Sequence, residues 1–134
     1  MIFTFRNNPA VRRNPQAYGW VSVDAGGLAT KISVKTPISQ EPLKDHAITG
    51  AFWFRRAADF VTCAEQMISA NARVAGEFYI DTCMNFLIEA KRCVRVFEVD
   101  RYVSWGTPND LRTYEYWQRY FTESRVQERT RQCA

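Results

Sequence analysis

The order in which strand-like and helix-like segments follow one another limits the folds open to this chain. Short β-prone runs cover residues 1–5, 18–23, 28–34, 47–54 and 94–99. Helical spacing of apolar residues appears at 57–70, again after Gly76, and finally from Pro108 to roughly Glu128. This order predicts an α/β fold, a mixed sheet with helices packed on it.

Two of the predicted strands carry local detail. Asp24–Gly27 is a turn with residues that accept positive φ, so the strands on either side of it should form a hairpin. The run Ala47–Phe54 is almost wholly apolar, which predicts a strand buried on both faces. Gly50 inside this strand is either a packing glycine or the wall of a substrate site.

Length and composition suit one packed domain. The chain has 134 residues, of which 46% are hydrophobic and 14% aromatic, more than a disordered chain carries. No apolar run approaches the ~20 residues that cross a bilayer, and residues 1–6 lack the long apolar stretch of a signal peptide. We therefore expect a cytoplasmic protein with no membrane partner.

Cysteine and histidine usage indicates neither a zinc site nor a disulfide framework. The four cysteines are widely spaced without a CxxC pair, and His46 is the only histidine. Cys63 and Cys83 fall on or near apolar helical faces. We expect them to be reduced thiols that fill the core rather than nucleophiles.

The net charge of +4 comes largely from arginine, which gathers in two groups. One group crowds the C-terminal tail with glutamates between its members, as on a solvated helix end. The other, Arg6, Arg12 and Arg13, lies in a predicted loop rich in asparagine. Neither group is interleaved with aromatic residues, so nucleic acid is not an expected partner.

The stretch Ser104–Leu111 predicts the start of the last helix. Thr107 is a suitable N-cap, Pro108 fits the first helical position, and Asp110 follows three residues after the cap. The alternating run Val94–Val99 predicts a half-buried strand before this corner. A strand, a glycine corner and a capped helix start form either an ordinary connection or a place that holds an anionic ligand.

Glu77 and Asp81 are four residues apart near the start of a predicted helix. If both are helical, they share one face as a carboxylate pair. The alternative is a helix N-terminus enriched in acidic residues, where carboxylates are favoured by the helix dipole.

Five short motifs occur in sequence order: Tyr18-Gly19-Trp20, Val34-Lys35-Thr36-Pro37, Ile48 to Phe54, Gly76 to Asp81, and Trp105 to Leu111. Together they resemble the second half of a sugar-phosphate nucleotidyltransferase of the nucleotide-sugar pyrophosphorylase family. That family joins a nucleoside triphosphate and a sugar 1-phosphate into a nucleotide sugar and pyrophosphate. The resemblance implies that residues 1–120 form the C-terminal, sugar-phosphate side of a Rossmann-like nucleotidyltransferase domain, and that 121–134 form a helical, charged tail.

The resemblance also implies roles for individual residues. Lys35 matches the lysine that contacts the sugar phosphate and is the predicted catalytic residue, while Gly19 lies where the backbone approaches the sugar. The other matches are to the pocket wall and to the acidic motif of the next helix start, namely Ile48, Thr49, Gly50, Glu77 and Asp81.

Several positions depart from the family pattern. Ser104 occupies the position of the second aspartate that holds the family's Mg²⁺, so either Asp100 substitutes for it or the metal is held differently. Val34 precedes Lys35 where the family has a glutamate, and Ala75 stands where some members carry a phosphate-binding arginine. The family's Gly-rich phosphate loop and first metal aspartate have no counterpart here.

Two functional hypotheses follow. In the first, the chain supplies the sugar 1-phosphate side of a nucleotidyltransferase site, is inactive alone, and meets the nucleoside triphosphate only together with the missing N-terminal half. In the second, it is a non-catalytic module that binds a sugar phosphate or another subunit.

The resemblance also bears on association. The family's sheet continues across both halves, so residues 1–5 and 47–54 are expected to pair with strands outside this chain. Open strand edges favour self-association. The alternative is that the last helix folds back over the sheet with an apolar stripe of Leu111, Tyr114, Trp117 and Phe121.

Overall fold

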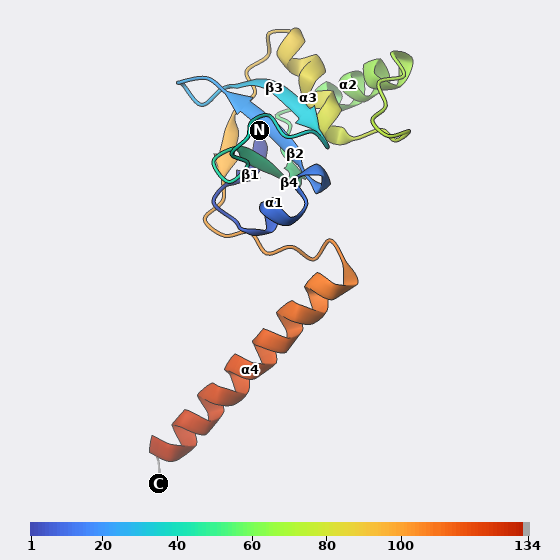
Figure 1. Cartoon of the computed structure of the whole chain (residues 1–134). Helices are drawn as coiled ribbons and strands as arrows, with labels where there is room; N and C mark the ends of the chain where they lie inside the picture. Colours follow the sequence, from blue (N-terminus) through green and yellow to red (C-terminus); the bar gives the residue numbers. More distant parts are fainter. Residues whose placement is uncertain (133–134) are drawn as a thin grey trace. The chain divides into compact units, whose positions relative to one another are not determined.

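The computed structural model describes residues 1–132, with side chains described through Glu123, and it divides into two compact units (Figure 1). The second unit begins at Val103 and contains α4 (Pro108–Gln132). The elements of the first unit, residues 1–102, are β1 (Ile2–Phe5), α1 (Ala10–Arg13), the 3₁₀ helix η1 (Pro15–Ala17), β2 (Gly19–Val23), β3 (Ala29–Val34), β4 (His46–Phe52), α2 (Ala57–Ser69), α3 (Ile80–Glu89) and β5 (Val96–Glu98).

The five strands form one mixed sheet in the order β3-β2-β4-β1-β5. β1 lies antiparallel to β4 and parallel to β5, and the predicted hairpin of β2 and β3 is present. Together with the helices, this sheet confirms the predicted α/β class.

The expectation that residues 1–5 and 47–54 need strands from outside the chain is wrong. β1 and β4 pair with each other, with Thr4 opposite Ile48. β1 also pairs with β5, and β4 with β2, so the edges of the sheet are β3 and β5. Self-association remains a prediction, but open strand edges at residues 1–5 and 47–54 no longer support it.

β4 is not buried on both faces along its length, as its apolar sequence predicts. Ala47 and Ile48 are buried, but Gly50 and Ala51 are exposed. β2 pairs only with the first two residues of β4, His46 and Ala47, so the later residues have no strand neighbour on that side. Beyond Ala47, β4 pairs only with β1, and its other edge has no strand neighbour.

A β-bulge in β4 accounts for the conformation of Gly50 and the hydrogen bonds of Thr49. Between Ile48 and Phe52 the strand has three residues, whereas β1 has the single residue Phe3 between their partners. Gly50 adopts φ +91°, a conformation that favours glycine, and no atom lies within 4 Å of where its Cβ would be. The Thr49 hydroxyl donates to the Phe3 carbonyl at 3.2 Å and accepts from the Ala51 N–H at 3.2 Å.

The core lies on both faces of the sheet. One cluster joins Ile2, Val21, Ile32 and Ile48 to Met84 of α3, and another gathers around Trp20 on the opposite face. A third cluster, between α2 and α3, consists of Cys63, Met67 and Cys83 with the partly buried side chains around them. Burial raises the pKa of both cysteine thiols, and the prediction that they fill the core is confirmed.

The edge strand β3 is partly covered by an asparagine of α3. Asn85 accepts the Ile32 N–H at 2.8 Å and donates to the Ile32 carbonyl at 3.0 Å. Its amide therefore pairs with β3 as a neighbouring strand would, and it anchors α3 to the sheet.

The predicted helix start in the second unit is confirmed. Thr107 Oγ1 accepts the Asp110 N–H at 3.2 Å, and the Asp110 carboxylate accepts the Thr107 N–H at 3.1 Å, a reciprocal capping box before Pro108. α4 continues through the predicted division at residues 120 and 121. Within the described part of the chain, no helix has the length and apolar character needed to span a membrane.

We predict that Asn85→Ala destabilises the fold by about 1–3 kcal/mol, because two hydrogen bonds to the backbone of β3 are lost in a partly buried place. The free energy of unfolding in urea measures this. Gln66→Ala, an exposed change on α2, is the control and should leave stability within about 0.5 kcal/mol. Equal stability of Asn85→Ala and the native chain would contradict the anchoring role.

Candidate functional site

The strand register gathers several predicted site residues at one end of the sheet, called here the carboxyl end after the direction of β1 and β5. Gly19 pairs with Val34, the residue before Lys35, and Trp20 pairs with Ala47. Ala47 in turn pairs with Phe5 at the end of β1. In open α/β sheets, ligands bind outside the carboxyl ends of the parallel strands, so this end is the candidate site.

Gly19 lies directly beneath Asp81, in the first turn of α3. A Cβ at Gly19 would stand 2.0 Å from Asp81 Oδ2 and 3.0 Å from Ile48 Cδ1. Only a residue without a side chain allows the carboxylate to come this close. Burial raises the pKa of Asp81, while the charge of Lys35 acts in the opposite direction.

Lys35 stands at the end of β3 with φ +61°, an uncommon conformation for a residue with a side chain. Its N–H donates to the Tyr18 carbonyl at 3.1 Å and its ammonium to the Ala17 carbonyl at 3.2 Å. The ammonium also lies 5.4 Å from the centre of the Tyr79 ring, just before α3. The Lys35 ammonium thus lies toward the start of α3.

Glu77 and Asp81 do not form a carboxylate pair on one helix face. Glu77 lies in the turn before α3, where it pairs with Val74, and only Asp81 is in the first helical turn. The Tyr79 hydroxyl donates to the Glu77 carboxylate, and this bond raises the pKa of Tyr79.

The structure therefore brings together Gly19, Lys35, Ile48 and Asp81. Thr49 and Gly50 lie farther along β4 in the bulge, where Thr49 bonds β1 rather than facing this group. Glu77 reaches the group only through Tyr79.

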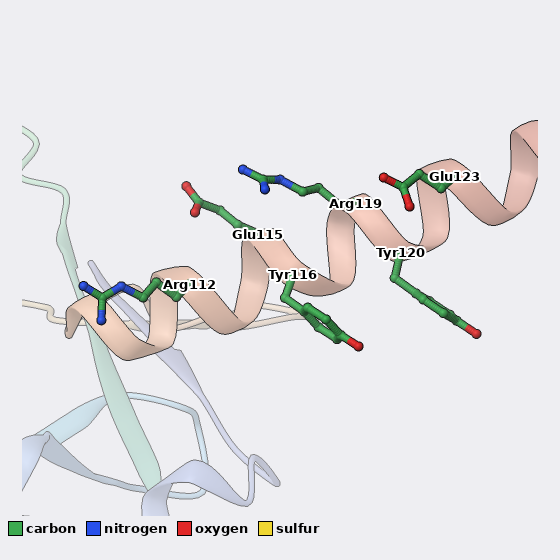
Figure 2. Close-up of a pocket in the computed structure, with 6 residues that line it drawn as sticks. All are labelled: Arg112, Glu115, Tyr116, Arg119, Tyr120 and Glu123. Atoms are coloured by element: carbon green, nitrogen blue, oxygen red, sulfur yellow. The ribbon is translucent and has the colours of Figure 1, made fainter.

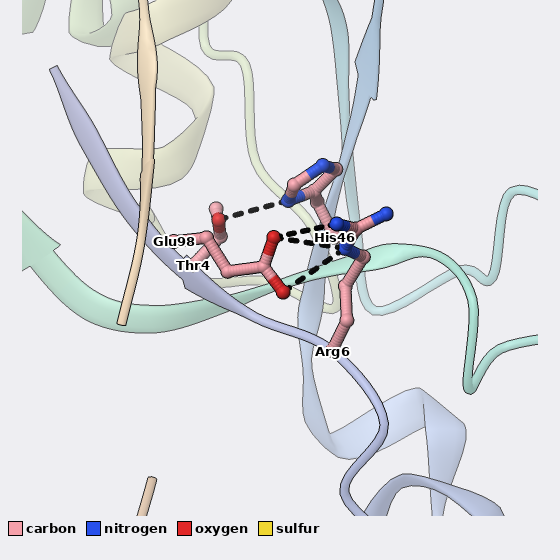
Figure 3. A network of polar contacts seen from close by, with 4 residues as sticks. All are labelled: Thr4, Arg6, His46 and Glu98. Carbon is pink, nitrogen blue, oxygen red and sulfur yellow. Dashed lines mark hydrogen bonds and ion pairs between the residues drawn. The ribbon is translucent and has the colours of Figure 1, made fainter. Parts of the chain in front are cut away.

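A polar network at the same end of the sheet was not predicted (Figure 3). Arg6 and Glu98 form an ion pair at 2.6 Å, with a second hydrogen bond from Arg6 Nε at 3.0 Å, and Thr4 Oγ1 lies 3.0 Å from His46 Nδ1. The alternation of side chains puts all four on the face of the sheet that holds Ile48. No local sequence signal indicates this network, since its partners are 42 and 92 residues apart.

Burial and the charges in this network lower the pKa values of His46 and Glu98. Burial, and then the charge of Arg6, lowers the pKa of His46, so the folded chain favours the neutral imidazole. The hydrogen bond from Arg6 lowers the pKa of Glu98, which keeps that carboxylate ionised.

The described residues do not assemble a ligand set for a resident Mg²⁺, and Asp100, the predicted substitute for Ser104, belongs to no cluster of possible ligands. Asp110 is occupied by the capping box, Glu98 is paired with Arg6, and Ser104 offers only a hydroxyl, which accepts the Gly106 N–H at 3.2 Å. Among the side chains that the structure describes, those of residues 1–123, no three of His, Cys, Asp or Glu come close enough to hold a metal ion. The ligand set that the family resemblance implies is therefore incomplete in this chain.

α4 carries a separate groove of about 420 Å³ along its own surface (Figure 2). Alternating charges, Arg112, Glu115, Arg119 and Glu123, border it together with Tyr116 and Tyr120. It contains no residue of the predicted site.

The sequence matches no protein-family model and no curated protein. The fold is similar to the crystal structure of the nucleoside-diphosphate-sugar pyrophosphorylase from Vibrio cholerae RC9, with a TM-score of 0.68 and 19% sequence identity. The match covers 84% of this chain but 44% of that chain, so this sequence spans less than half of its neighbour's length. The similarity shows that the two chains share an α/β fold with a mixed sheet over the matched part.

We predict that Gly19→Ala destabilises the fold by about 1–3 kcal/mol, because the added methyl group overlaps the Asp81 carboxylate. The cost should fall by more than half when the same substitution is made in an Asp81→Ala background. Urea unfolding of the four proteins of this double-mutant cycle measures the coupling. An equal cost in both backgrounds would show that Asp81 is not what excludes a side chain at Gly19.

We also predict that His46 makes the fold less stable in mild acid. Its pKa in the folded chain lies below the ordinary value of 6.5, so as the pH falls through 6.5 the unfolded chain takes up the proton more readily. Between pH 7.5 and pH 5.5, the unfolding free energy of the native chain should therefore fall relative to that of His46→Gln. The raised pKa of Asp81 acts in the opposite direction in both proteins and cancels in this comparison. Identical pH dependence would refute the effect.

Proposed function

We propose that this chain supplies the sugar 1-phosphate side of a nucleotidyltransferase site that makes a nucleotide sugar and pyrophosphate. The observation that carries the proposal is the placement of Lys35 beside Asp81 and Gly19 at the carboxyl end of a nucleotidyltransferase-like sheet. A cation next to a carboxylate in a partly buried place suits a ligand that carries both phosphate and hydroxyl groups.

In this proposal, the Lys35 ammonium holds the sugar phosphate. Its present partners are a backbone carbonyl and an aromatic ring rather than a carboxylate at hydrogen-bond distance, so its charge is available to an anion. Asp81 accepts a sugar hydroxyl, and Gly19 leaves the room that this requires. Ile48 forms the apolar wall beneath the sugar ring, and Glu77 is a proposed contact through Tyr79. Thr49 and Gly50, implied by the family resemblance, lie in the bulge and stay a prediction without a contact at this place.

The nucleoside triphosphate and its Mg²⁺ would bind chiefly to parts of the enzyme that this chain does not contain. The match covers less than half of the neighbour's length, which supports the binding of the triphosphate to another part of the enzyme. The chain alone is then expected to be inactive and to reside in the cytoplasm.

A second candidate function is a non-catalytic module that binds a sugar phosphate or another subunit. Ser104 favours it, because its hydroxyl takes part in the local turn where the family would carry a metal aspartate. Titration of the chain with ATP shows whether the chain itself binds the triphosphate or whether that binding needs another part of the enzyme. Tight binding of ATP at the Lys35 end, recognised by its loss in Lys35→Gln, would reject both proposals as stated.

We predict that Lys35→Gln weakens the binding of glucose 1-phosphate, used as the probe, by about tenfold, since one charge-assisted hydrogen bond is lost. Glutamine keeps the Cβ and a similar length at the strained φ. Lys31→Gln, on the exposed part of the same strand, is the matched control and should bind as the native chain does. Isothermal titration calorimetry measures both. Equal affinities of the two variants would remove Lys35 from the proposed site.

A further inference from the structure

A pocket of about 470 Å³ opens at the end of the sheet opposite to Lys35. β4 runs from the candidate site at His46 to Phe52, and the residues that follow it line this pocket. α3 likewise runs from Asp81 at the candidate site toward Arg92 at the pocket. The pocket is therefore separate from the candidate site at the Lys35 end of the sheet.

The charges that line the pocket are predominantly positive. Arg56 and Asp59 neutralise each other through hydrogen bonds of 2.7 and 3.2 Å. Asp59 is the only carboxylate in the lining, whereas Arg55 and Arg92 also line it and have no side-chain hydrogen bond or ion pair with any residue that the structure describes. The charge of Arg92 contributes to lowering the pKa of Asp59, after that of Arg56, which places Arg92 beside this pair. Two guanidinium groups thus remain uncompensated.

An exposed aromatic ring completes the lining. Trp53 is 52% exposed, although its backbone is fixed by a hydrogen bond to the Met1 carbonyl at 2.9 Å. Phe54, its neighbour, is instead packed against Phe60, with ring centres 5.2 Å apart. Trp53, directly after β4, therefore leaves about half of its aromatic side chain exposed at the pocket.

We propose that this pocket binds an anion that joins a phosphate group to a planar ring, as in a nucleoside monophosphate. The guanidinium groups of Arg55 and Arg92 hold the phosphate, because their planar forks match its oxygens. The ring stacks on Trp53, as bases do on aromatic side chains. The volume of the pocket is within the range of small-molecule sites, roughly 300–1,000 Å³.

Cys93 provides the readout for a test, because it lines the pocket and is exposed, whereas Cys63 and Cys83 are buried. The full chain carrying Cys133→Ser is alkylated with iodoacetamide in the presence of AMP, inorganic phosphate or adenosine. AMP should slow the modification of Cys93 several-fold, and adenosine, which lacks the phosphate, should not. Absence of protection by AMP, or equal protection by adenosine, overturns the proposal.

Variants test the phosphate and the ring of the proposed ligand separately. Arg55→Ala with Arg92→Ala should weaken the binding of both AMP and inorganic phosphate by about tenfold or more, as expected for lost charge-assisted hydrogen bonds. Arg12→Ala with Arg13→Ala removes the same charge from exposed positions in α1 and should change neither affinity. Trp53→Leu should weaken AMP binding alone.

Calorimetry supplies these affinities, and circular dichroism verifies that each variant is folded. Equal losses in the two double variants would indicate general charge attraction and would overturn the site. Unchanged AMP affinity in Trp53→Leu would overturn the stacking of the ring. Protection of Cys93 in the chain with a native pocket decides the proposal even where a variant fails to fold.

Discussion

The pairing of β1 with two distant segments is the constraint on which the first unit depends. β1 has only four residues, yet its register aligns Thr4 with Ile48 on one side and with Glu98 on the other. Thr4 is fully buried between them. Because side chains alternate with a period of two, a slip of one residue would move every side chain of β1 to the other face, and the Arg6–Glu98 pair and the Thr4–His46 contact would be lost together.

The elements that sequence reasoning predicted well are those specified by neighbouring residues. The capping box at Thr107 and Asp110 and the hairpin turn at Asp24–Gly27 need only local geometry, and both are present. The burial of Cys63 and Cys83 likewise followed from the period of their helices. In each case a few consecutive residues contain the whole signal.

What the sequence could not predict depends on which segments become neighbours. The apolar run at 47–54 indicates a buried strand, but its exposure is decided by how far β2 extends beside it. Gly50 is explained by a bulge that exists only when β1 and β4 are paired in this register. The approach of Asp81 to Gly19 requires the N-terminus of α3 to lie against β2 at one particular position along the sheet. No sequence periodicity specifies this position. Residue types at the site were thus predictable, whereas their contacts were not.

Unfavourable features of the first unit concentrate at the carboxyl end of its sheet. Asp81 is a carboxylate whose pKa is raised by burial, Gly19 must stay without a side chain to admit it, and Lys35 holds a positive φ. Each of these costs folding free energy, and none is needed to build a hairpin or to pack a helix on a sheet. Elsewhere, positive φ values in this unit fall mostly in turns or at helix ends, such as Asn71 and Lys91, where they are common. Local rules that are broken together in one place are typical of sites selected for binding rather than for stability, and this supports the proposal of a sugar-phosphate site at the Lys35 end of the sheet.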